Sequence, residues 1–233
     1  MTRNLDRRSF LSTSAAMGAG YWIASASAAA PPKASRSPNE KLNIAGIGVG
    51  GMGAGDLGAV APGNNIVALC DADLRRSAET FKRFPEAKPY RDFRKMLDEM
   101  DKQIDAVVVA TPDHTHAVAA MAAIRRGKHV YCEKPLAHSV HEVRQLVKAA
   151  KDHDVVTQLG NQGHSFETIR MFCEWIWDGA IGQVHTIHAG CTAVNSGIDA
   201  LPRLKEKHDV PAELEWDLWL GPAQFRPYHP AYL

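Results

Sequence analysis

The sequence is poor in cysteine, has almost no net charge and contains no long hydrophobic run. Its four cysteines are far apart and form no CxxC pair, which argues against a zinc site and against a small disulfide-stapled fold. We expect free, mostly buried thiols at Cys70, Cys132, Cys173 and Cys191. The formal net charge of +1 argues against a nucleic-acid partner, because such a partner requires a basic surface. With 45% hydrophobic and 23% charged residues, the 233-residue chain should form a packed core in one large or two small domains.

The first forty residues differ in character from the rest of the chain. Arg7-Arg8-Ser9-Phe10-Leu11 is a twin-arginine motif, and a run of small, weakly apolar residues follows from 12 to 30. Within this run, Ala26-Ser27-Ala28 fits an A-x-A cleavage site. The run is too short and too rich in alanine, serine and glycine for a transmembrane helix. We therefore expect a Tat export signal over 1–30, a linker over 31–40, the Tat machinery as a partner, and a periplasmic or otherwise exported protein.

From Lys41 onward, short β-rich runs alternate with helical stretches. This alternation predicts an α/β fold, namely a doubly wound parallel sheet of the Rossmann type over residues 41–160. Asp113 is expected to cap a helix that ends near Arg126, and Ser139 with Glu142 forms a capping box for the next helix. The predicted strands are 42–47, 66–70, 106–110, 130–132 and 155–159.

The character of the chain changes near residue 161. A helix is predicted over 166–178 and a strand over 184–194, and the final stretch is rich in proline and tryptophan. We interpret residues 161–233 as the start of a second, α+β domain.

A glycine-rich motif follows the first predicted strand directly. Its residues, Gly48-Val49-Gly50-Gly51-Met52-Gly53, form a G-x-G-x-x-G pattern between a strand and a helix, as the dinucleotide-binding fingerprint requires. The first glycine permits a tight turn, the second lets the backbone approach a pyrophosphate, and the third lets the helix pack closely on the strand. Free N–H groups at the helix start attract phosphate oxygens. The alternative is a glycine-rich turn that binds nothing; we predict that these six residues bind a nucleotide.

An acid ends the second predicted strand, as the same fingerprint requires. Asp71 follows Ile66-Val67-Ala68-Leu69-Cys70 and lies 18 positions after Gly53. A carboxylate there accepts hydrogen bonds from the adenosine ribose and repels a 2′-phosphate, so it favours NAD. Arg75 and Arg76 could pair with such a phosphate or could face solvent on a helix, so NADP stays open.

Polar segments follow the later predicted strands. Ligands bind at the carboxyl ends of the strands in an open α/β sheet, so these segments should lie beside the glycine motif. The predicted cofactor contacts there are Ala110, Thr111, Pro112, His116, Glu133 and Lys134, and the predicted substrate-lining residues are Asn161, Gln162 and His164. His114 and His116 lie two positions apart with no third ligand at metal-ligand spacing, so no metal site is predicted.

Four motifs, GIGVGGMG, ALCDAD, VVVATPDHTH and VYCEKPLA, occur in this order, and together they resemble the Gfo/Idh/MocA family of oxidoreductases. The resemblance runs from about Leu42 onward and is most specific up to about Ser165. It implies a Rossmann domain followed by an α+β domain, whose large open sheet often mediates homo-oligomerisation. It also implies hydride transfer between NAD or NADP and a sugar, polyol or related carbonyl compound.

The resemblance gives the E-K-P motif a role. In the family its lysine lies near the nicotinamide and the substrate, which implies that Lys134 is catalytic, and the bond before its proline is often cis, here Lys134–Pro135. An ammonium at a partly desolvated strand end can hydrogen-bond a substrate hydroxyl, stabilise an oxyanion or relay a proton. Glu133 beside it should hold the local geometry or contact the cofactor.

The sequence departs from the family in its last part. Family members also carry an aspartate and a histidine, with three residues between them, in the second domain, but residues 166–233 contain no D-x-x-x-H. We therefore expect a C-terminally truncated chain with an incomplete second domain. Three functions stay open: an exported NAD(P)-dependent oxidoreductase with tightly held cofactor, an NAD-dependent glycosidase, and a nucleotide-binding fragment without catalysis.

Overall fold

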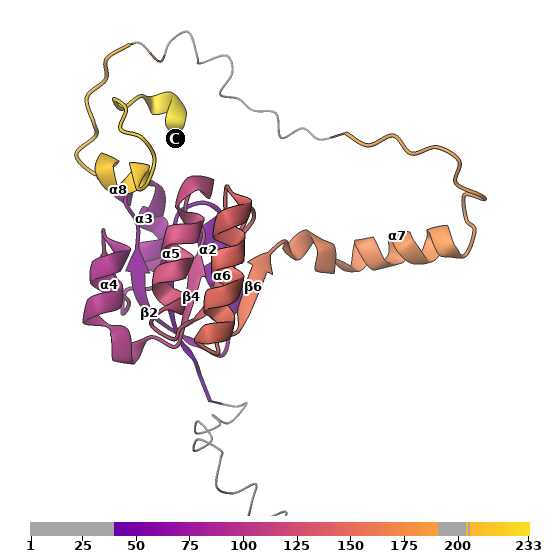
Figure 1. The fold of residues 1–233 in the computed structure, drawn as a ribbon, viewed down its shortest axis with the longest axis horizontal. Coiled ribbons are helices and arrows are strands. Elements are labelled where there is room, and N and C mark those ends of the chain that lie inside the picture. The colour runs from indigo at the N-terminus through magenta and orange to yellow at the C-terminus, as the bar shows by residue number, and fades with distance from the viewer. Residues whose placement is uncertain (1–39, 191–203, 205) are drawn as a thin grey trace, which may run out of the picture. The chain divides into compact units, whose positions relative to one another are not determined.

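A six-stranded sheet in the order β3-β2-β1-β4-β5-β6 forms the centre of the structure (Figure 1). The structure, a computed structural model, describes residues 40–190, 204 and 206–233, and its compact unit is Lys41–Leu233. All neighbouring strands run parallel. The chain builds one half of the sheet outward from β1 to β3 and then returns to the centre for β4. This confirms the predicted doubly wound α/β fold, whereas the expected Tat signal lies outside the described residues.

The strands are β1 Asn43–Ile47, β2 Asn65–Cys70, β3 Lys88–Tyr90, β4 Ala106–Val109, β5 His129–Glu133 and β6 Thr157–Gly160. The helices are α2 Met52–Val60, α3 Leu74–Arg83, α4 Phe93–Glu99, α5 His116–Ile124, α6 Val140–Asp152, α7 Glu167–Trp177 and α8 Trp216–Leu220. The five predicted strands are confirmed. β3 was not located from the sequence, because its three residues, one of them Pro89, are too few to show a period.

Helices cover both faces of the sheet. On one face α4, α5 and α6 pack together, and Ala119, Ala120 and Ala123 of α5 are buried against the strands. Their small side chains let α5 lie close to the sheet. On the other face Leu57 of α2 is fully buried with Val108 of β4, and burial of such a side chain stabilises the fold by about 2 kcal/mol. The two cores hold the carboxyl ends of the strands in fixed positions.

The helix boundaries differ from the prediction at one place. Asp113 does not cap α5; it begins a short 3-10 helix, Asp113–Thr115, and Thr115 is the residue before α5. The Thr115 hydroxyl donates to the Pro112 carbonyl at 2.9 Å and closes this turn, so the predicted role of Asp113 was wrong. The capping box is confirmed, since Ser139 Oγ accepts from the Glu142 N–H at 3.2 Å and donates to its carboxylate at 2.9 Å.

The segment after the sheet is only partly as predicted. Helix α7 matches the predicted helix 166–178. The predicted strand 184–194 is wrong for residues 184–190, which have no strand pairing among the described residues; residues 191–194 lie outside them. A β-rich sequence becomes a strand only when a partner strand supplies its hydrogen bonds. That residues 161–233 begin a second domain stays a prediction.

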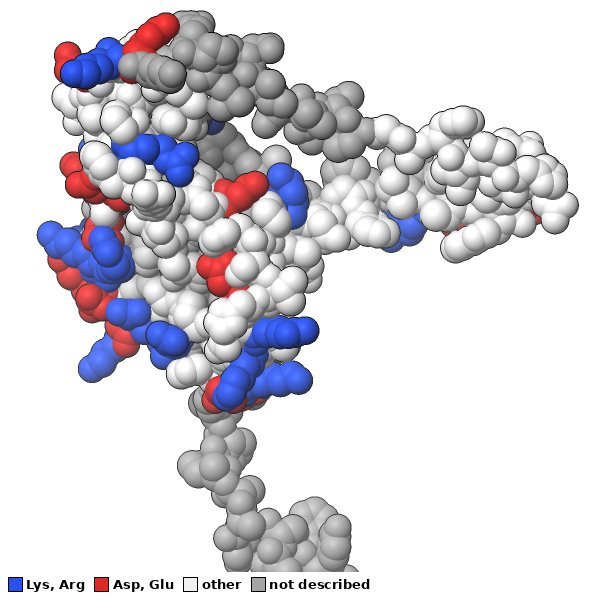
Figure 2. All heavy atoms as spheres, turned by 45° about the horizontal axis from the view of Figure 1, so that its top comes forward, with Lys and Arg blue, Asp and Glu red and all other residues white. Residues whose placement is uncertain are grey.

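The cysteines and charges fit their sequence-based expectations where they are described. Cys70 and Cys132 are free and buried, and burial raises the pKa of the Cys132 thiol to about 12. Cys173 is free and half-buried, and Cys191 lies outside the described residues. On the face shown in Figure 2, positive and negative side chains are intermixed rather than gathered by sign. Among the described helices, none has the length and apolarity needed to cross a bilayer.

Candidate functional site

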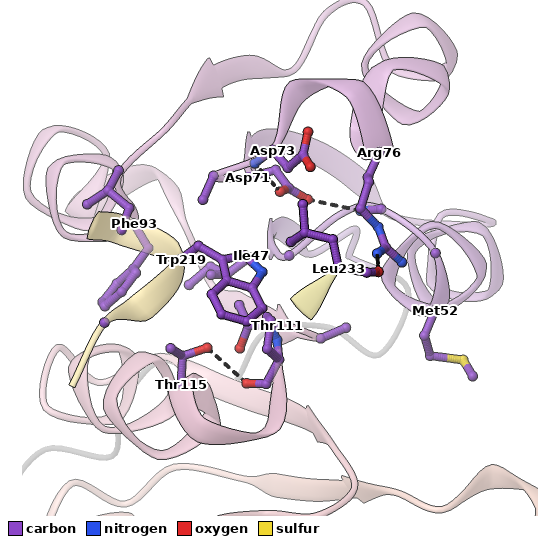
Figure 3. Close-up of a pocket in the computed structure, with 18 of the residues that line it drawn as sticks. Ile47, Met52, Asp71, Asp73, Arg76, Phe93, Thr111, Thr115, Trp219 and Leu233 are labelled. Carbon is purple, nitrogen blue, oxygen red and sulfur yellow. Dashed lines mark hydrogen bonds between the residues drawn. The ribbon is translucent and has the colours of Figure 1, made fainter. Parts of the chain in front are cut away.

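A cavity of about 350 Å³ opens at the carboxyl ends of β1, β2 and β4 (Figure 3). It is bordered by the β1–α2 loop, by the residues after β2 and by the loop after β4. The predicted site residues that line it are Gly48, Gly50, Gly51, Met52, Asp71, Ala110, Thr111 and Pro112. The structure therefore brings the glycine motif, the acid and the β4 loop together around one space.

Gly48 and Gly53 cannot be replaced by larger residues without moving the backbone. Gly48 has a φ of +76°, and a Cβ there would lie 2.6 Å from the nitrogen of Thr111. A Cβ on Gly53 would lie 1.9 Å from the Gly48 carbonyl oxygen. These contacts are the tight turn and the close helix packing that the motif predicts. Val49 between them points into the core and is fully buried.

Gly50 and Gly51 differ in what surrounds them. A Cβ on Gly50 would lie 2.9 Å from the carbonyl oxygen of Arg76, so the start of α3 packs against this glycine, a reason that the sequence did not reveal. Gly51 has a φ of +50°, and the nearest atom to a Cβ there is a guanidinium nitrogen of Arg76 at 3.9 Å. The open space beside Gly51 lies at the start of α2, where it fits the pyrophosphate of a dinucleotide.

Asp71 joins the end of β2 to the glycine loop. Its Oδ2 accepts from the N–H groups of Val49 at 2.8 Å and Gly50 at 3.1 Å, and its Oδ1 accepts from Asp73 N–H at 2.9 Å. Burial raises the pKa of the Asp71 carboxyl, although these three backbone hydrogen bonds oppose the shift. Two carboxylate oxygens offer about four acceptor positions, so Asp71 can also accept from a ribose hydroxyl in the cavity.

The two arginines after Asp71 have different partners. Arg75 forms a bidentate ion pair with Asp73, from Nε to Oδ1 at 3.0 Å and from Nη2 to Oδ2 at 2.7 Å. Although burial opposes it, the hydrogen bonds from Arg75 hold the pKa of Asp73 below its usual value. Arg76 lines the cavity, and its guanidinium donates to the Leu233 carbonyl. Arg76 is therefore the arginine that borders the space where a nucleotide phosphate would lie.

His116 lies beneath the β4 loop. Its ring is 1% exposed, its Nε2 lies 2.6 Å from the Thr111 carbonyl oxygen, and its Nδ1 lies 2.6 Å from that of Pro135. It therefore ties the loop after β4 to the turn after β5. The described cavity lining does not include His116.

At the end of β5, the Glu133 side chain is buried, whereas the neighbouring Lys134 is exposed to solvent. The Lys134–Pro135 peptide bond is cis, as the resemblance implied. Glu133 is buried, and its Oε1 accepts from Gln162 Nε2 at 3.0 Å. Lys134 is exposed, so the partial desolvation expected at this strand end is not found. Asn161, Gln162 and His164 are also exposed, and within the described part of the chain none of these residues borders the cavity.

A second buried acid faces Glu133 from α2. Asp56 is 7% exposed, and burial together with the negative charge of Glu133 raises its pKa to about 6. Burial, Asp56 and Glu133 raise the pKa of Tyr131 to about 12, which keeps its hydroxyl protonated. That hydroxyl donates to Gln162 Oε1 at 3.1 Å. Sequence reasoning did not single out Asp56, because an aspartate on a helix usually faces solvent.

Residues 213–233, here named the C-terminal segment, complete the cavity and were missed by sequence reasoning. The segment docks beside Asp71: Glu215 N–H donates to the Ala72 carbonyl at 2.9 Å, and Leu74 N–H donates to that of Glu213 at 3.1 Å. Its cavity-lining residues are Leu218, Trp219, Gly221, Tyr232 and Leu233. The contacts cross more than 100 positions of sequence, for example 122 between Arg91 and Glu213, and leave no periodic signal.

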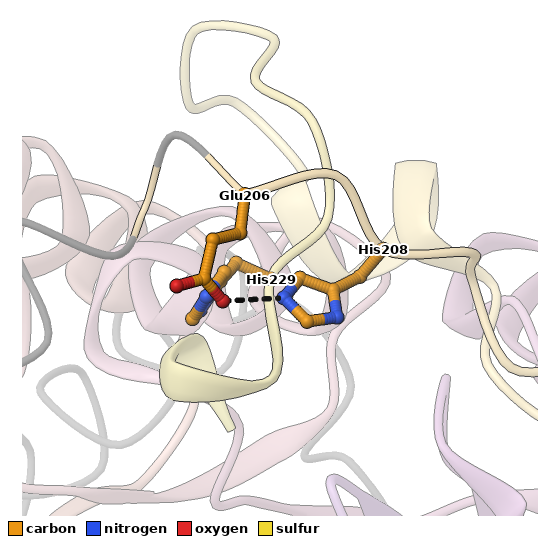
Figure 4. A group of neighbouring side chains, drawn as sticks. All are labelled: Glu206, His208 and His229. Carbon is orange, nitrogen blue, oxygen red and sulfur yellow. Dashed lines mark ion pairs between the residues drawn. The ribbon is translucent and has the colours of Figure 1, made fainter.

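Glu206, His208 and His229 form a separate cluster whose potential ligand atoms lie within 4.8 Å of one another (Figure 4). His208 Nε2 lies 3.5 Å from a Glu206 oxygen. His229 Nδ1 accepts from Ala231 N–H at 3.1 Å, so the neutral ring carries its proton on Nε2, for which the described residues offer no partner. Metal binding through Nε2 would require this proton to move to Nδ1 and the hydrogen bond from Ala231 to break, and we assign no metal ion to this cluster.

Comparison with known families supports the nucleotide assignment. A family model described as an oxidoreductase family with an NAD-binding Rossmann fold matches residues 42–161, just over half of the chain. The matched range begins one residue before β1 and ends one residue after β6, so it contains the whole sheet.

Individual relatives are enzymes named for sugar-like substrates. A levoglucosan dehydrogenase of Pseudarthrobacter phenanthrenivorans is 32% identical over 62% of this chain and 39% of its own length. A glycosyl hydrolase family 109 protein of Saccharopolyspora erythraea is 34% identical over 77% of this chain and 44% of its own length. The crystal structure of a myo-inositol 2-dehydrogenase from Lactobacillus plantarum, 26% identical, superimposes with a TM-score of 0.55 over 62% of this chain and 43% of that chain. The chain spans less than half the length of these relatives.

Proposed function

Because the chain belongs to the Gfo/Idh/MocA family of oxidoreductases, we propose that it binds NAD or NADP in the cavity beside Gly48–Gly53 and serves hydride transfer to or from a sugar, polyol or related carbonyl compound. The observation that carries the proposal is the pairing of Asp71 with the glycine loop at the edge of this cavity. A bare glycine turn would have no need of a half-buried acid that both fixes the loop and borders an open space.

Along the carboxyl edge of the sheet, some residues are assigned to the cofactor and others to the substrate. The nicotinamide ring of the bound cofactor supplies the hydride acceptor or donor. Gly51 leaves room for the pyrophosphate, and Asp71 accepts from the adenosine ribose. We assign Lys134 as the catalytic residue that donates a hydrogen bond to the substrate oxygen, with Asn161, Gln162 and His164 beside the substrate. Glu133 holds the turn through Gln162.

The engaged Arg75 supports a preference for NAD. Its guanidinium is occupied by Asp73, so Arg76 alone of this pair borders the cavity to balance a 2′-phosphate, while Asp71 repels it. Titration of the purified chain with NAD and with NADP tests this. We expect NAD to bind more tightly, and equal or reversed affinities contradict the preference.

Turnover is tested with the same protein. Oxidation of a panel of polyols and sugars is followed by NADH formation, and Lys134→Ala should lower the rate by roughly 10²–10⁴-fold. Binding of nucleotide without turnover on any substrate supports the nucleotide-binding fragment instead. Absence of nucleotide binding contradicts the proposed function itself.

A second candidate is an NAD-dependent glycosidase, favoured by the match to the glycosyl hydrolase family 109 protein over 77% of the chain. The glycosidase and the dehydrogenase differ in whether the reaction leaves the cofactor reduced. Release of free sugar from a set of glycosides without net NADH formation identifies the glycosidase, whereas NADH accumulation identifies the dehydrogenase.

The twin-arginine segment extends the proposal to export. Replacing Arg7 and Arg8 by lysine should keep the protein in the cytoplasm, because the Tat machinery recognises the arginine pair. Free nicotinamide cofactor is scarce outside the cytoplasm, so we propose that it is loaded before export and held tightly. Exported protein that carries no nucleotide contradicts tight loading. We propose a homo-oligomer for the full-length protein, which light scattering tests.

A further inference from the structure

The C-terminal segment is anchored directly beside the acid of the nucleotide site. Leu214 forms an antiparallel bridge with Asp73, and Arg91 Nη2 donates both to the Ala72 carbonyl at 3.0 Å and to the Glu213 carbonyl at 2.7 Å. These bonds use the backbone of the two residues that follow Asp71. The segment is therefore held at the adenosine-ribose end of the site, since that is where the β2 acid acts in dinucleotide folds.

The segment has its own small core, which fixes the position of Trp219. Trp216 is 6% exposed and its indole N–H donates to the Arg226 carbonyl at 2.8 Å. The rings of Trp216 and Trp219 are stacked, with centroids 4.8 Å apart and planes inclined by 13°. Tyr228 meets Trp216 edge-on at 5.3 Å. One face of the Trp219 indole is thus covered by a buried ring.

The rest of Trp219 is directed into the cavity. Its backbone carbonyl lies 2.9 Å from His114 Nε2, and the two rings lie 5.1 Å apart with planes inclined by 58°, so the β4 loop also holds Trp219 in place. The indole lies among the cavity residues in Figure 3, close to the view's centre, and is only half-buried. Phe93 and Val118 add apolar surface to the same lining.

We propose that the C-terminal segment is a wall of the nucleotide site and that Trp219 is a cofactor-binding residue, whose indole packs against the adenine ring. This inference rests on the proposed nucleotide-binding function and assigns its adenine subsite. A base and an indole stack favourably because both are flat, polarisable and apolar on their faces. A ring already fixed by Trp216 and His114 loses little freedom when the base arrives.

The test compares nucleotide affinities of the full chain by calorimetry, using NAD and ADP-ribose. ADP-ribose lacks the nicotinamide, so an equal loss for both ligands locates the effect at the adenosine half. Trp219→Ala should weaken both by about tenfold, the effect of removing a stacked ring, whereas Trp219→Phe should stay within about threefold. Trp177→Ala is the matched control, because Trp177 is 81% exposed on α7 and should not change either affinity.

Each outcome decides a different point. Wild-type affinity in Trp219→Ala overturns the inference and leaves the proposed function standing. Tighter binding by this variant also overturns it, because Trp219 would then occupy the place of the base. Failure of the wild-type chain to bind either ligand contradicts the proposed function and this inference with it. Thermal unfolding checks that the variants fold; if Trp219→Ala does not, Trp219→Leu, which keeps apolar volume without a ring, should show the same loss.

Discussion

The carboxyl edge of the sheet has two ends that differ in how completely they are enclosed. At the ends of β1, β2 and β4, four segments of the chain surround one cavity, and the acid, the glycines and an indole meet there. At the ends of β5 and β6, Lys134 and residues 161–164 lie exposed. Only Gly160 before them is buried, beside the Glu133 side chain. The two ends, to which we assign nucleotide binding and substrate chemistry respectively, are therefore built differently in this chain.

The enclosed end should depend on backbone geometry, and Gly53→Ala tests this most severely. The new Cβ would lie 1.9 Å from the Gly48 carbonyl oxygen, so α2 must move away from the loop. We expect a loss of about 3 kcal/mol or more in the free energy of unfolding and no measurable nucleotide binding. Urea unfolding and calorimetry measure both.

Gly55→Ala in the same helix is the control for that variant. A Cβ on Gly55 has open space around it, so the substitution should stabilise α2 by about 0.5–1 kcal/mol and leave affinity unchanged. Equal behaviour of the two variants would mean that the contact between Gly53 and Gly48 does not define the site.

Asp56 lies where the two ends meet, and its protonation should make stability depend on pH. The folded state raises the pKa of Asp56 to about 6, above the usual value of 3.8, so it binds the proton more tightly than the unfolded state. This contribution is present at low pH and is lost as the pH rises from about 4 to about 6. Asp56→Asn should therefore be more stable than wild type by about 2–3 kcal/mol at about pH 7.5 and nearly equal at about pH 3.

Urea unfolding at both pH values measures this difference. Asp178→Asn, an exposed aspartate after α7, is the control and should show the same small difference at each pH. A constant gap between Asp56→Asn and wild type across the range rules out the titration of Asp56.

Asp71→Asn should weaken NAD binding by about tenfold, because a neutral amide accepts more weakly from the ribose and from the N–H groups of Val49 and Gly50. The variant should also lose discrimination against NADP, since the charge that repels the 2′-phosphate is gone. Calorimetric titration with both cofactors measures the two effects. A loss of affinity with unchanged discrimination would assign Asp71 to loop support alone.

Lys134→Ala should have the smallest effect on binding, less than about threefold in NAD affinity, since one exposed ammonium contributes little. A tenfold loss would show that the exposed end also holds the cofactor, and the separation of the two ends would then fail.

The parts predicted from the sequence are those with local signals. Gly48–Gly53 and Asp71 were recognisable because a strand, a turn and a helix follow one another at fixed spacing. The capping role predicted for Asp113 was wrong because the hydrogen bond from Thr115 to Pro112 closes a short 3-10 turn at Asp113, and α5 begins only after that turn. Trp219 was missed because the part of the site that it meets is more than 100 positions away in sequence, as in its contact with His114 across 105 positions. The exposure of Lys134 depends on what packs around it, which no local pattern encodes.

The bridge between Asp73 and Leu214 also has a consequence for the order of events during synthesis. The ribosome releases the glycine loop and the sheet long before Trp219 emerges, so the cavity acquires this wall only after the sheet has been made. An adenine ring stacked on Trp219 can then be held only by a chain that has folded back on its own beginning. In the Tat export proposed above, cofactor retention would in this way report that the chain is folded, which is the condition that this pathway sets for its passengers.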